Sequence, residues 1–516
     1  MKKFFQLVFT ALFITTSFFT TSLMAQTAQD LVKKSIYEQQ TSIVDEFKTF
    51  LSIPNVASNP KGLQENADWI MSYMKAKGIE DISLLTLPNS QMPPVVYGEV
   101  KVPGATETII FYAHYDGQPV DTTKWFPGLH PFKPSLYSGM YEKEATVMPW
   151  LTKGSNYDMN ARIYARGASD DKAGVMAIIN AYAQLKALNI KPTVNIKFFF
   201  EGEEEAGSPN LEAFLELYKN KLAANFWIIC DGPVHQSSKK QLVMGVRGDT
   251  HLELTIFGPK RPLHSGHYGN WVLNPAMELA RLLASMKNEK GEVTIKGFYD
   301  DVTPLTNAEK QALAKVPSVE AQLKDELGIN ATEREGALND ALQLPSLNIN
   351  GIQSAGVGKY SANVIPTKAI ASVDMRLVVG NNWEKQQQKV IDHIIAQGFF
   401  VTDKEPTDEE RKLNAKICMV VRDKKSYNAQ KTSLDNPYVR RISKAISQVS
   451  NEQPVLLPTL GGSLPLFVFE KVLKTSPVTV PIANHDNNQH AENENIKLKN
   501  FFEGIQLFSS IMTMEK

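Results

Sequence analysis

Four carboxylates stand together in the stretch Glu201-Gly202-Glu203-Glu204-Glu205-Ala206-Gly207-Ser208. This stretch follows the apolar run Asn195-Ile196-Lys197-Phe198-Phe199-Phe200, which predicts a buried strand carrying the acids at its C-terminal end. A charge run is ordinarily a solvated turn. At the end of a core strand, however, the acids need protons or cations to neutralise them, and a divalent metal ion does so most directly.

Histidine and aspartate follow two other predicted strands. His114 and Asp116 come directly after the apolar segment 107–113, and Asp231 follows the apolar segment 225–230. On an extended backbone His114 and Asp116 point to the same face, so both could reach one ion. A lone His-x-Asp pair is weak support for a metal site, because such pairs also occur as turn or capping residues.

A pair of acids, Asp170-Asp171, precedes the predicted helix 175–187. Ser169 or Asp170 could simply cap this helix. A cap needs only one carboxylate, so the pair also fits a metal site. Further along the chain, the segment 484–494 offers His485 and His490 after the strand-like run 476–482.

The elements that must position these residues alternate between strand and helix from residue 107 to residue 231. This alternation predicts a mostly parallel sheet, and ligands of such sheets collect at the C-terminal ends of the strands. From about residue 241 the pattern changes to alternating strands over 243–257, 347–352 and 369–377, with helices over 274–287 and 383–397. The β-α-β-β-α-β order predicts a smaller α+β sandwich inserted into the first domain.

These patterns predict a domain division. Residues 1–25 read as a signal peptide, 26–241 as the first part of the main domain, 242–430 as an inserted smaller domain, and 431–516 as the second part of the main domain. The segment 122–160, rich in Pro, Gly, Trp and Tyr, is predicted to be a long loop over the site.

Composition narrows the function classes. The 516 residues carry 55 basic and 55 acidic side chains, and this zero net charge offers no field for nucleic acid or an anionic membrane. Lys2-Lys3, an apolar stretch and Ala25 predict a secretory signal peptide, so we expect an exported protein, periplasmic or secreted, without stable membrane association after cleavage. The two cysteines, Cys230 and Cys418, are too few for a disulfide framework.

Five motifs, taken in order, carry a resemblance to a known family: AHYDG, ARGASDDKAG, EGEEEAGS, CDG and QHAENE. Together they resemble the M20 family of metallopeptidases, and within it the carnosinase-like dipeptidase branch, over essentially the whole mature chain. The resemblance implies that His114 and Asp231 bind one metal ion and that Glu205 and His490 bind a second. Asp170 would bridge the two ions.

The resemblance also implies roles for neighbouring acids. Glu204 would be the general base, Asp116 would orient the imidazole of His114, and the peptide that joins Asp170 to Asp171 would be cis. The assignment could shift by one position within Glu203-Glu204-Glu205, and Asp171 competes with Asp170.

The resemblance implies that the main domain is catalytic and that the insert, 242–430, is a lid and dimerisation domain. In the implied homodimer, His264 reaches across the interface to stabilise the oxyanion. Arg376, Gly462 and Ser463 would bind the substrate carboxylate. Asn363 stands where relatives commonly carry Thr, and Leu460 where relatives often carry a charged residue. Both departures fall near the expected specificity pocket. The remaining histidines are predicted to be structural, namely His130, His235, His251, His267 and His393.

The implied chemistry is hydrolysis. Two divalent ions about 3.5 Å apart would bind a water between them, lower its pKa and polarise the scissile carbonyl, and Glu204 would move the proton to the leaving amine. Nitrogen and oxygen ligands suit Zn²⁺, with Mn²⁺ or Co²⁺ as alternatives. The predicted function is a dinuclear exopeptidase acting on dipeptides or short peptides. The alternatives are an N-acyl-amino-acid deacylase or a carboxypeptidase on the same scaffold, and a non-catalytic binding protein, which the complete ligand set disfavours.

Overall fold

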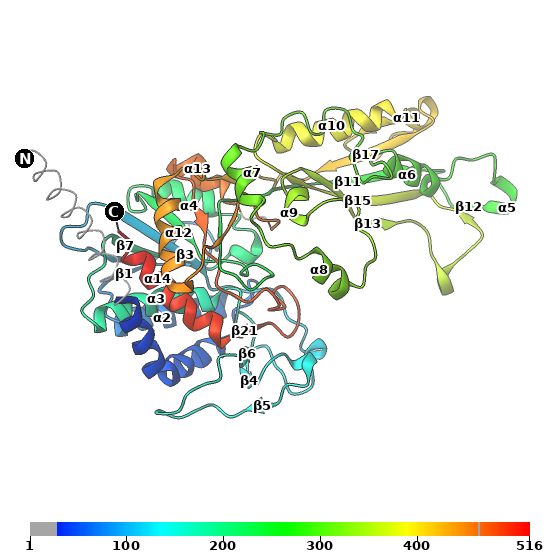
Figure 1. Cartoon of the computed structure of the whole chain (residues 1–516). Helices are drawn as coiled ribbons and strands as arrows, with labels where there is room; N and C mark the ends of the chain where they lie inside the picture. Colours follow the sequence, from blue (N-terminus) through cyan, green and yellow to red (C-terminus); the bar gives the residue numbers. More distant parts are fainter. Residues whose placement is uncertain (1–27, 463–464, 516) are drawn as a thin grey trace, which may run out of the picture. The chain divides into compact units, whose positions relative to one another are not determined.

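The structure is a computed structural model that describes residues 28–462 and 465–515. The chain forms two compact units (Figure 1). Unit 1 comprises Met1–Met244, Ser433–Leu456 and Lys471–Lys516, and unit 2 comprises Gly245–Thr432 and Leu457–Glu470. Residues 457–470, which the sequence-based division counts with the returning segment, cluster with unit 2. The expected signal peptide, residues 1–25, falls outside the described residues.

Unit 1 is built on an eight-stranded sheet with the order β1-β2-β7-β3-β8-β20-β9-β19. Its strands are β1 (Asp81–Leu85), β2 (Val95–Val100), β3 (Thr108–His114), β7 (Asn195–Glu201), β8 (Phe226–Ile229), β9 (Gln241–Val243), β19 (Val455–Leu457) and β20 (Val478–Thr479). The central strands β7, β3, β8 and β20 run parallel. The carboxyl ends of β3, β7 and β8 therefore meet at one edge of the sheet.

Both faces of this sheet are buried, which explains the continuous apolar runs of its strands. Side chains alternate along β7, so Phe198 and Phe200 belong to the main core of unit 1. Phe199 points to the opposite face, where its ring lies 5.9 Å from that of Phe214 in α4. Helices on both faces thus hold the strand whose end carries the acidic run.

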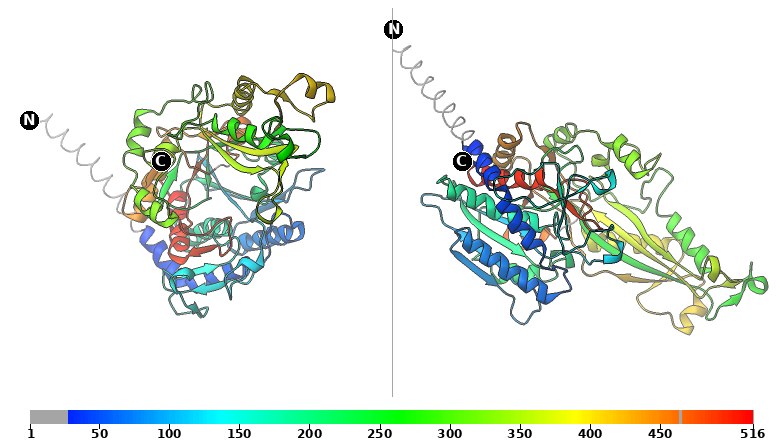
Figure 2. Two further views of the ribbon diagram at one scale, coloured as in Figure 1. Left: turned by 90° about the vertical axis from the view of Figure 1, so that its right-hand side faces the viewer. Right: turned by 90° about the horizontal axis from the view of Figure 1, so that it is seen from below.

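The helices of unit 1 are a helix over residues 28–51, α2 (Pro60–Ala76), α3 (Lys172–Ala187), α4 (Leu211–Leu217), α12 (Pro437–Ser450) and α14 (Leu498–Met512). The helix α3 is buried on almost every side and packs against α14 (Figure 2). α13 (Phe467–Leu473) spans the division between the units.

A second, four-stranded sheet of unit 1 has the order β21-β6-β4-β5. It consists of β4 (Ser135–Tyr137), β5 (Val147–Met148), β6 (Arg162–Tyr164) and β21 (Asn495–Lys497). The segment 122–160, predicted to be a loop, thus contributes two short strands as well as the turns η1 (Thr122–Lys124) and η2 (Tyr141–Lys143). The antiparallel pairing of β21 with β6 brings the segment after His490 beside the segment before Asp170.

Unit 2 contains a five-stranded sheet of order β13-β15-β11-β17-β16. Its strands are β11 (Gly248–Phe257), β13 (Ser346–Gln353), β15 (Lys368–Leu377), β16 (Phe400–Thr402) and β17 (Ile417–Arg422), and α6 (Pro275–Ala284) and α10 (Trp383–Ala396) pack against it. Two short pairs complete the strands, β10 (Gly245–Val246) with β18 (Gln430–Lys431) and β12 (Leu263–His264) with β14 (Val364–Ile365). The smaller helices are α5 (Ser265–Tyr268), α7 (Asn307–Leu313), α8 (Glu320–Leu327), α9 (Leu338–Ala341) and α11 (Asp408–Leu413).

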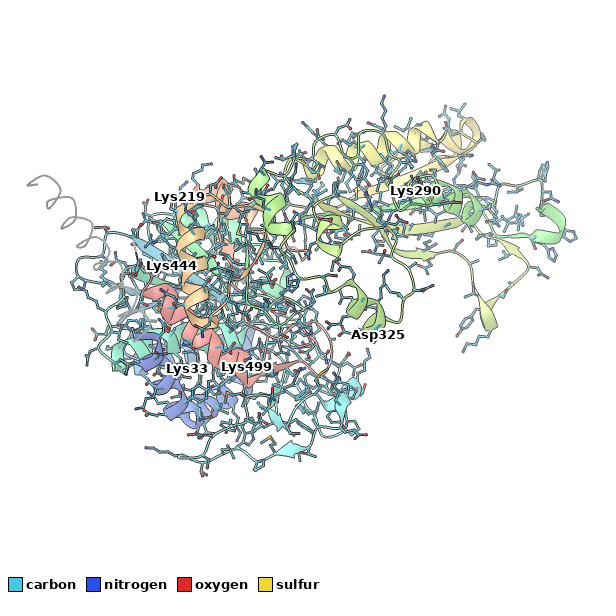
Figure 3. All side chains as sticks on the ribbon, in the orientation of Figure 1. Lys33, Lys219, Lys290, Asp325, Lys444 and Lys499 are labelled. Atoms are coloured by element: carbon cyan, nitrogen blue, oxygen red, sulfur yellow. The ribbon has the colours of Figure 1, made fainter. Side chains whose placement is uncertain are left out.

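Exposed charged side chains occur on both units (Figure 3), among them Lys219 and Lys444 of unit 1 and Lys290 and Asp325 of unit 2. Among the described residues, no helix has the length and apolar character needed to cross a bilayer. The mixed α/β architecture with a parallel central sheet confirms the fold class predicted from the sequence.

Candidate metal centre

Three strand ends and two loops of unit 1 deliver the predicted ligands. His114 is the last residue of β3, Glu204 and Glu205 open a single 3-10 turn (η3, Glu204–Ala206) just after β7, and Asp231 follows β8. Asp170 lies in the loop between β6 and α3, and His490 lies in the loop before β21. The parallel arrangement of β7, β3 and β8 explains why residues so distant in sequence share one edge.

The carboxylate of Asp170 lies between two imidazoles. Its Oδ1 is 2.9 Å from Nε2 of His114, and its Oδ2 is 3.1 Å from Nε2 of His490. The Nε2 atom of His490 also lies 3.3 Å from Oε2 of Glu205. Asp170 therefore connects two histidine groups, one through each oxygen.

The surrounding carboxylates complete two overlapping groups of ligand atoms. His114, Glu204 and Asp231 each offer one atom within 4.8 Å of the others, and so do His114, Asp170 and Glu205. Nitrogen and carboxylate oxygen donors at this density match the preference of divalent transition-metal ions. The donor set therefore fits the pair of cations that the sequence predicts.

The electrostatics of the cluster show how crowded the acids are. Burial and neighbouring acids raise the pKa of Glu204 well above its usual value, that of Glu205 to about 8, and that of Asp231 to about 6. Burial also acts to raise the pKa of Asp170, but hydrogen bonds with His114 and His490 outweigh it and hold that pKa below the usual range. Without positive charge, the three raised carboxylates resist ionisation together.

The structure separates the candidates that the sequence left open. Glu203 turns away and accepts hydrogen bonds from the backbone N–H and the Nδ2 group of Asn210, both at 3.0 Å. Asp171 caps α3 by accepting a hydrogen bond from the backbone N–H of Gly174 at 3.1 Å. The Asp170–Asp171 peptide is cis. Asp170, not Asp171, therefore faces the histidines.

Asp116 and Gln118 hold the members of the cluster in place. Asp116 is fully buried, with Oδ1 3.3 Å from Nδ1 of His114. It also accepts hydrogen bonds from the backbone N–H groups of Glu204 (3.2 Å) and Glu205 (2.9 Å). Gln118 donates a hydrogen bond of 2.6 Å to Oε2 of Glu205. One carboxylate thus orients a histidine and the turn that carries both glutamates.

The sequence from residue 110 to residue 514 matches peptidase family M20/M25/M40. The chain belongs to this peptidase family. The matched range contains every member of the cluster, from His114 to His490. The resemblance inferred from the five motifs is thereby confirmed.

Two curated relatives of this M20 chain are named as dipeptidases. The Cys-Gly metallodipeptidase dug1 of Schizosaccharomyces pombe is 28% identical over 493 residues, which cover 92% of this chain and 96% of the relative. The Beta-Ala-His dipeptidase of Homo sapiens is 27% identical over 443 residues, covering 83% and 80% of the two chains. This M20 member is accordingly a hydrolase of the metallopeptidase type.

A solved structure shows the same architecture. The M20 family metallo-carboxypeptidase Sso-CP2 from Sulfolobus solfataricus superposes with a TM-score of 0.74 at 28% identity, covering 92% of this chain and 98% of the other. The similarity extends over both units of the M20 chain.

The residues predicted to bind substrate belong to unit 2. His264 and Asn363 lie at the β12–β14 end of the sheet, where the backbone N–H of Ser265 donates a hydrogen bond to the carbonyl of Asn363 at 3.1 Å. Gly462 is also in unit 2, whereas Ser463 falls outside the described residues.

Arg376 stands near the other end of β15. Its Nε atom is 3.4 Å from Oδ1 of Asp249 and 3.4 Å from Oδ1 of Asp374. His251, predicted to be structural, lies 2.9 Å from Asp249 through Nε2 and completes this charged group. Because a guanidinium already stands between the two acids, the group is an ion-pair network rather than a second cation site.

His264 and Arg376 lie far apart within unit 2. The pairs Phe257–Lys368 and Leu263–Ile365 place His264 near the start of β15, and Arg376 is close to its end. At about 3.3 Å per residue, the strand from Lys368 to Arg376 is roughly 26 Å long. One chain therefore cannot bring both side chains to the same small substrate.

Sequence reasoning missed several residues that support the cluster. Gln118 directly follows the AHYDG motif, and Glu494 closes the QHAENE motif. Arg166 stands within ARGASDDKAG and pairs with Glu494 at 2.8 Å. Their positions within or directly beside the motifs are the available signal, but nothing in the sequence shows which backbone groups they bind.

Proposed function

We propose that the protein is a dinuclear metal-dependent exopeptidase that hydrolyses dipeptides or short peptides. The observation that carries the proposal is the Asp170 carboxylate, which meets His114 at 2.9 Å and His490 at 3.1 Å through different oxygens. Such an arrangement suits a carboxylate shared by two ions. The dipeptidase activities that name the yeast and human relatives support the substrate class.

In this proposal, His114 and Asp231 would hold one divalent ion, Glu205 and His490 would hold the other, and Asp170 would be shared by both. When bound, the ions would polarise the scissile carbonyl and make the attacking water more acidic. Zinc is the metal we favour, with Mn²⁺ or Co²⁺ as alternatives.

Glu204 acts as the general base. Its Oε2 lies 3.8 Å from Nε2 of His114, and 13% of its side chain is exposed, so a water molecule at the centre can reach it. Burial raises the pKa of Glu204, so its ionised carboxylate is a stronger base than that of an exposed glutamate. It would take a proton from the attacking water and then donate that proton to the leaving amine. The backbone of Glu204 is held by Asp116 during both transfers.

Substrate recognition is assigned to unit 2. Arg376, with Gly462 and Ser463, would read the free C-terminal carboxylate by charge-assisted hydrogen bonds, and Asn363 would contribute to specificity. The Nε atom of Arg376 is engaged by Asp249 and Asp374. Among the described residues, its two terminal nitrogens have no hydrogen-bond partner, so they are free for a ligand.

The deciding experiment compares metal content and dipeptide hydrolysis for the protein from Gln26 onward and for Glu204→Ala. We expect two ions per chain in both proteins and a loss of turnover of about 10²- to 10⁴-fold in the variant. If both proteins bind metal but wild type hydrolyses no free dipeptide, the result would favour an N-acyl-amino-acid deacylase or a carboxypeptidase. Similarity to the Sulfolobus metallo-carboxypeptidase makes longer peptides the first alternative substrates. Absence of bound metal would contradict all of these activities.

We also propose a homodimer formed through the β12–β14 end of unit 2. Trp271, Val357 and Tyr360 project there with 80%, 82% and 73% of their surfaces exposed. Exposed apolar side chains of this size mark an interface. A second copy would supply His264 to the site that uses Arg376, which a single chain cannot do.

Light scattering tests the dimer. Wild type is expected to have the mass of two chains, and Trp271→Glu that of one chain. Leu217→Glu, at a 52% exposed leucine of α4 in unit 1, should leave the mass unchanged. A monomeric wild type would contradict the proposal.

Export is the third part of the proposal, and it is supported by the Lys2-Lys3 pair and the apolar stretch that follows. N-terminal sequencing of the protein from its natural source is expected to begin at Gln26. A protein that retains Met1 would contradict export by this signal.

A further inference from the structure

Glu494 is a fully buried carboxylate that accepts five hydrogen bonds. Its Oε1 receives the backbone N–H and the hydroxyl of Ser169, at 2.8 and 3.0 Å, and the backbone N–H of Asp170 at 3.0 Å. Its Oε2 receives the backbone N–H of Gly167 at 2.9 Å and Nη1 of Arg166 at 2.8 Å. A single side chain therefore anchors the whole loop that ends at Asp170.

The same contacts connect this loop to the segment of His490. Arg166, only 3% exposed, uses Nη1 for Glu494 and Nη2 for the carbonyl of Ala491, which it reaches at 2.9 Å. The backbone N–H of Ala165 donates to the carbonyl of Glu494 at 3.1 Å. His490 precedes Ala491 directly, so its backbone is tied to the Asp170 loop through Arg166.

On the far side, the Asp170 loop is fastened by Lys172. The buried amine of Lys172 donates to the carbonyls of Phe50 and Ile53 at 2.8 and 2.7 Å. Glu494 and Lys172 thus hold the two sides of the loop, and only the Asp170 carboxylate is left to face the histidines.

We propose that Glu494 is the positioning residue of the metal centre, setting the distance between the Asp170 carboxylate and the His490 imidazole. The inference rests on the proposed function insofar as Asp170 and His490 are taken to be metal ligands. Glu494 itself bonds only to the loop and to Arg166, so it acts on the ions through the residues that it holds.

The carboxylate form of Glu494 is essential to this role. Both oxygens face only donors: three N–H groups of the backbone, one hydroxyl and one guanidinium. An amide of the same shape must direct its own NH₂ group at some of these donors. Glu494→Gln therefore loses hydrogen bonds on one side and cancels the buried charge that balances Arg166.

The test uses the full mature protein stripped with a chelator and titrated with Zn²⁺ alone, and separately with Co²⁺ alone. The proteins compared are wild type, Glu494→Gln, and Glu309→Gln as the matched control. Glu309 is also a buried glutamate, paired with Lys431 at 2.6 Å, but it belongs to unit 2. The readouts are metal affinity, the visible absorption spectrum of bound Co²⁺, and thermal stability of the stripped protein.

Mutation of a residue that holds metal ligands in place typically lowers metal affinity about 10- to 100-fold. We expect about that loss in Glu494→Gln together with an altered Co²⁺ spectrum, whereas Glu309→Gln should lose stability only. An unchanged affinity and spectrum in Glu494→Gln would overturn the proposal and leave the peptidase assignment intact. A wild type that binds no metal would overturn both.

If Glu494→Gln does not fold, two milder variants decide the question. Ser169→Ala removes one of the five hydrogen bonds to Glu494. Arg166→Lys replaces the two guanidinium nitrogens that bind Glu494 and the carbonyl of Ala491 with a single amine on a shorter side chain. Each is expected to weaken metal binding about three- to ten-fold and to shift the Co²⁺ spectrum. Wild-type affinity and spectrum in both would overturn the role of Glu494.

Discussion

At the scale of single residues, the proposed metal ligands are fixed by carboxylates that are not themselves proposed ligands. Asp116 holds the backbone of Glu204 and Glu205, and Glu494 holds the loop of Asp170. A site that gathers so many like charges can keep its geometry only if the backbone of each ligand is itself bound.

The partly buried ion pair of Arg162 with Asp486 leads to a pH-dependent prediction. Burial alone would raise the pKa of Asp486, but hydrogen bonds with Arg162 (2.7 Å) and Asn484 (2.8 Å) outweigh it and lower that pKa to about 2. Since the pKa of an unfolded Asp is about 3.9, the pair stabilises the fold above pH 4. This stabilisation is lost as the pH falls towards 2.

Asp486→Asn should therefore lower the free energy of unfolding by about 1–2 kcal/mol at pH 7, a value reduced from the full shift because 27% of the side chain is exposed. The difference from wild type should shrink between pH 5 and pH 3. Urea denaturation in the presence of chelator measures it. A difference that stays constant with pH would show that the charge of Asp486 is not its source. The exposed Asp68→Asn serves as a control that should change little at any pH.

At the same scale, the sequence could predict which residue types gather but not which of several neighbours faces inward. Glu203, Glu204 and Glu205 are adjacent and chemically alike, and only the 3-10 turn with its bond from Asn210 separates them. The choice of His490 over His485, and of Asp170 over Asp171, depends likewise on local backbone geometry. Such geometry has no periodic signal in the sequence.

At the scale of elements, the loop between β6 and α3 is closely packed at Gly167. Gly167 has φ +77°, and a Cβ added there would lie 2.9 Å from Nδ2 of Asn55 and 3.3 Å from the side chain of Lys172. Gly104 has a similar φ of +82°, but a Cβ there would meet nothing within 4 Å. The two glycines thus share the same backbone cost and differ in packing.

Gly104→Ala should cost about 1–2 kcal/mol of stability from the left-handed backbone alone. Gly167→Ala should cost about 2–4 kcal/mol of stability, since it adds a clash. It should also weaken metal binding, because the clash displaces the backbone N–H that Gly167 donates to Glu494. Chemical denaturation and metal titration distinguish the two variants. Equal effects in both would mean that the Asp170 loop tolerates displacement.

The strands that carry the site could be predicted because buried parallel strands give continuous apolar runs. β3, β7 and β8 follow that rule. The strands β4 and β5 could not be predicted from the sequence, since they are three and two residues long and lie in a segment rich in Pro and Gly. β5 pairs with β4, β4 also pairs with β6, and β6 pairs with β21, which lies more than 300 residues further along the chain. Local amino-acid composition does not predict a strand partner so distant in sequence.

At the scale of the whole molecule, the division into two units separates the proposed metal ligands from the proposed substrate-binding residues. All proposed metal ligands belong to unit 1, and four of the five proposed substrate residues are described, all in unit 2. The change between parallel and alternating strand patterns near residue 241 predicts a domain boundary there, and the contact-based units divide at Met244 and Gly245. The sequence could not predict that residues 457–470 cluster with unit 2, because hydrophobic patterns do not reveal which core a short segment joins.

The length of β15 has a genetic consequence. If His264 and Arg376 serve one substrate from different chains, then His264→Ala and Arg376→Ala are each inactive alone but lie on opposite sides of the same shared site. A mixed dimer holds one site in which both residues are intact and one in which both are lost. Random pairing makes half of the dimers mixed, so co-expression of the two inactive variants should restore about a quarter of the wild-type activity. Two null alleles of one gene would then complement each other, and failure to do so would return His264 to a role within its own chain.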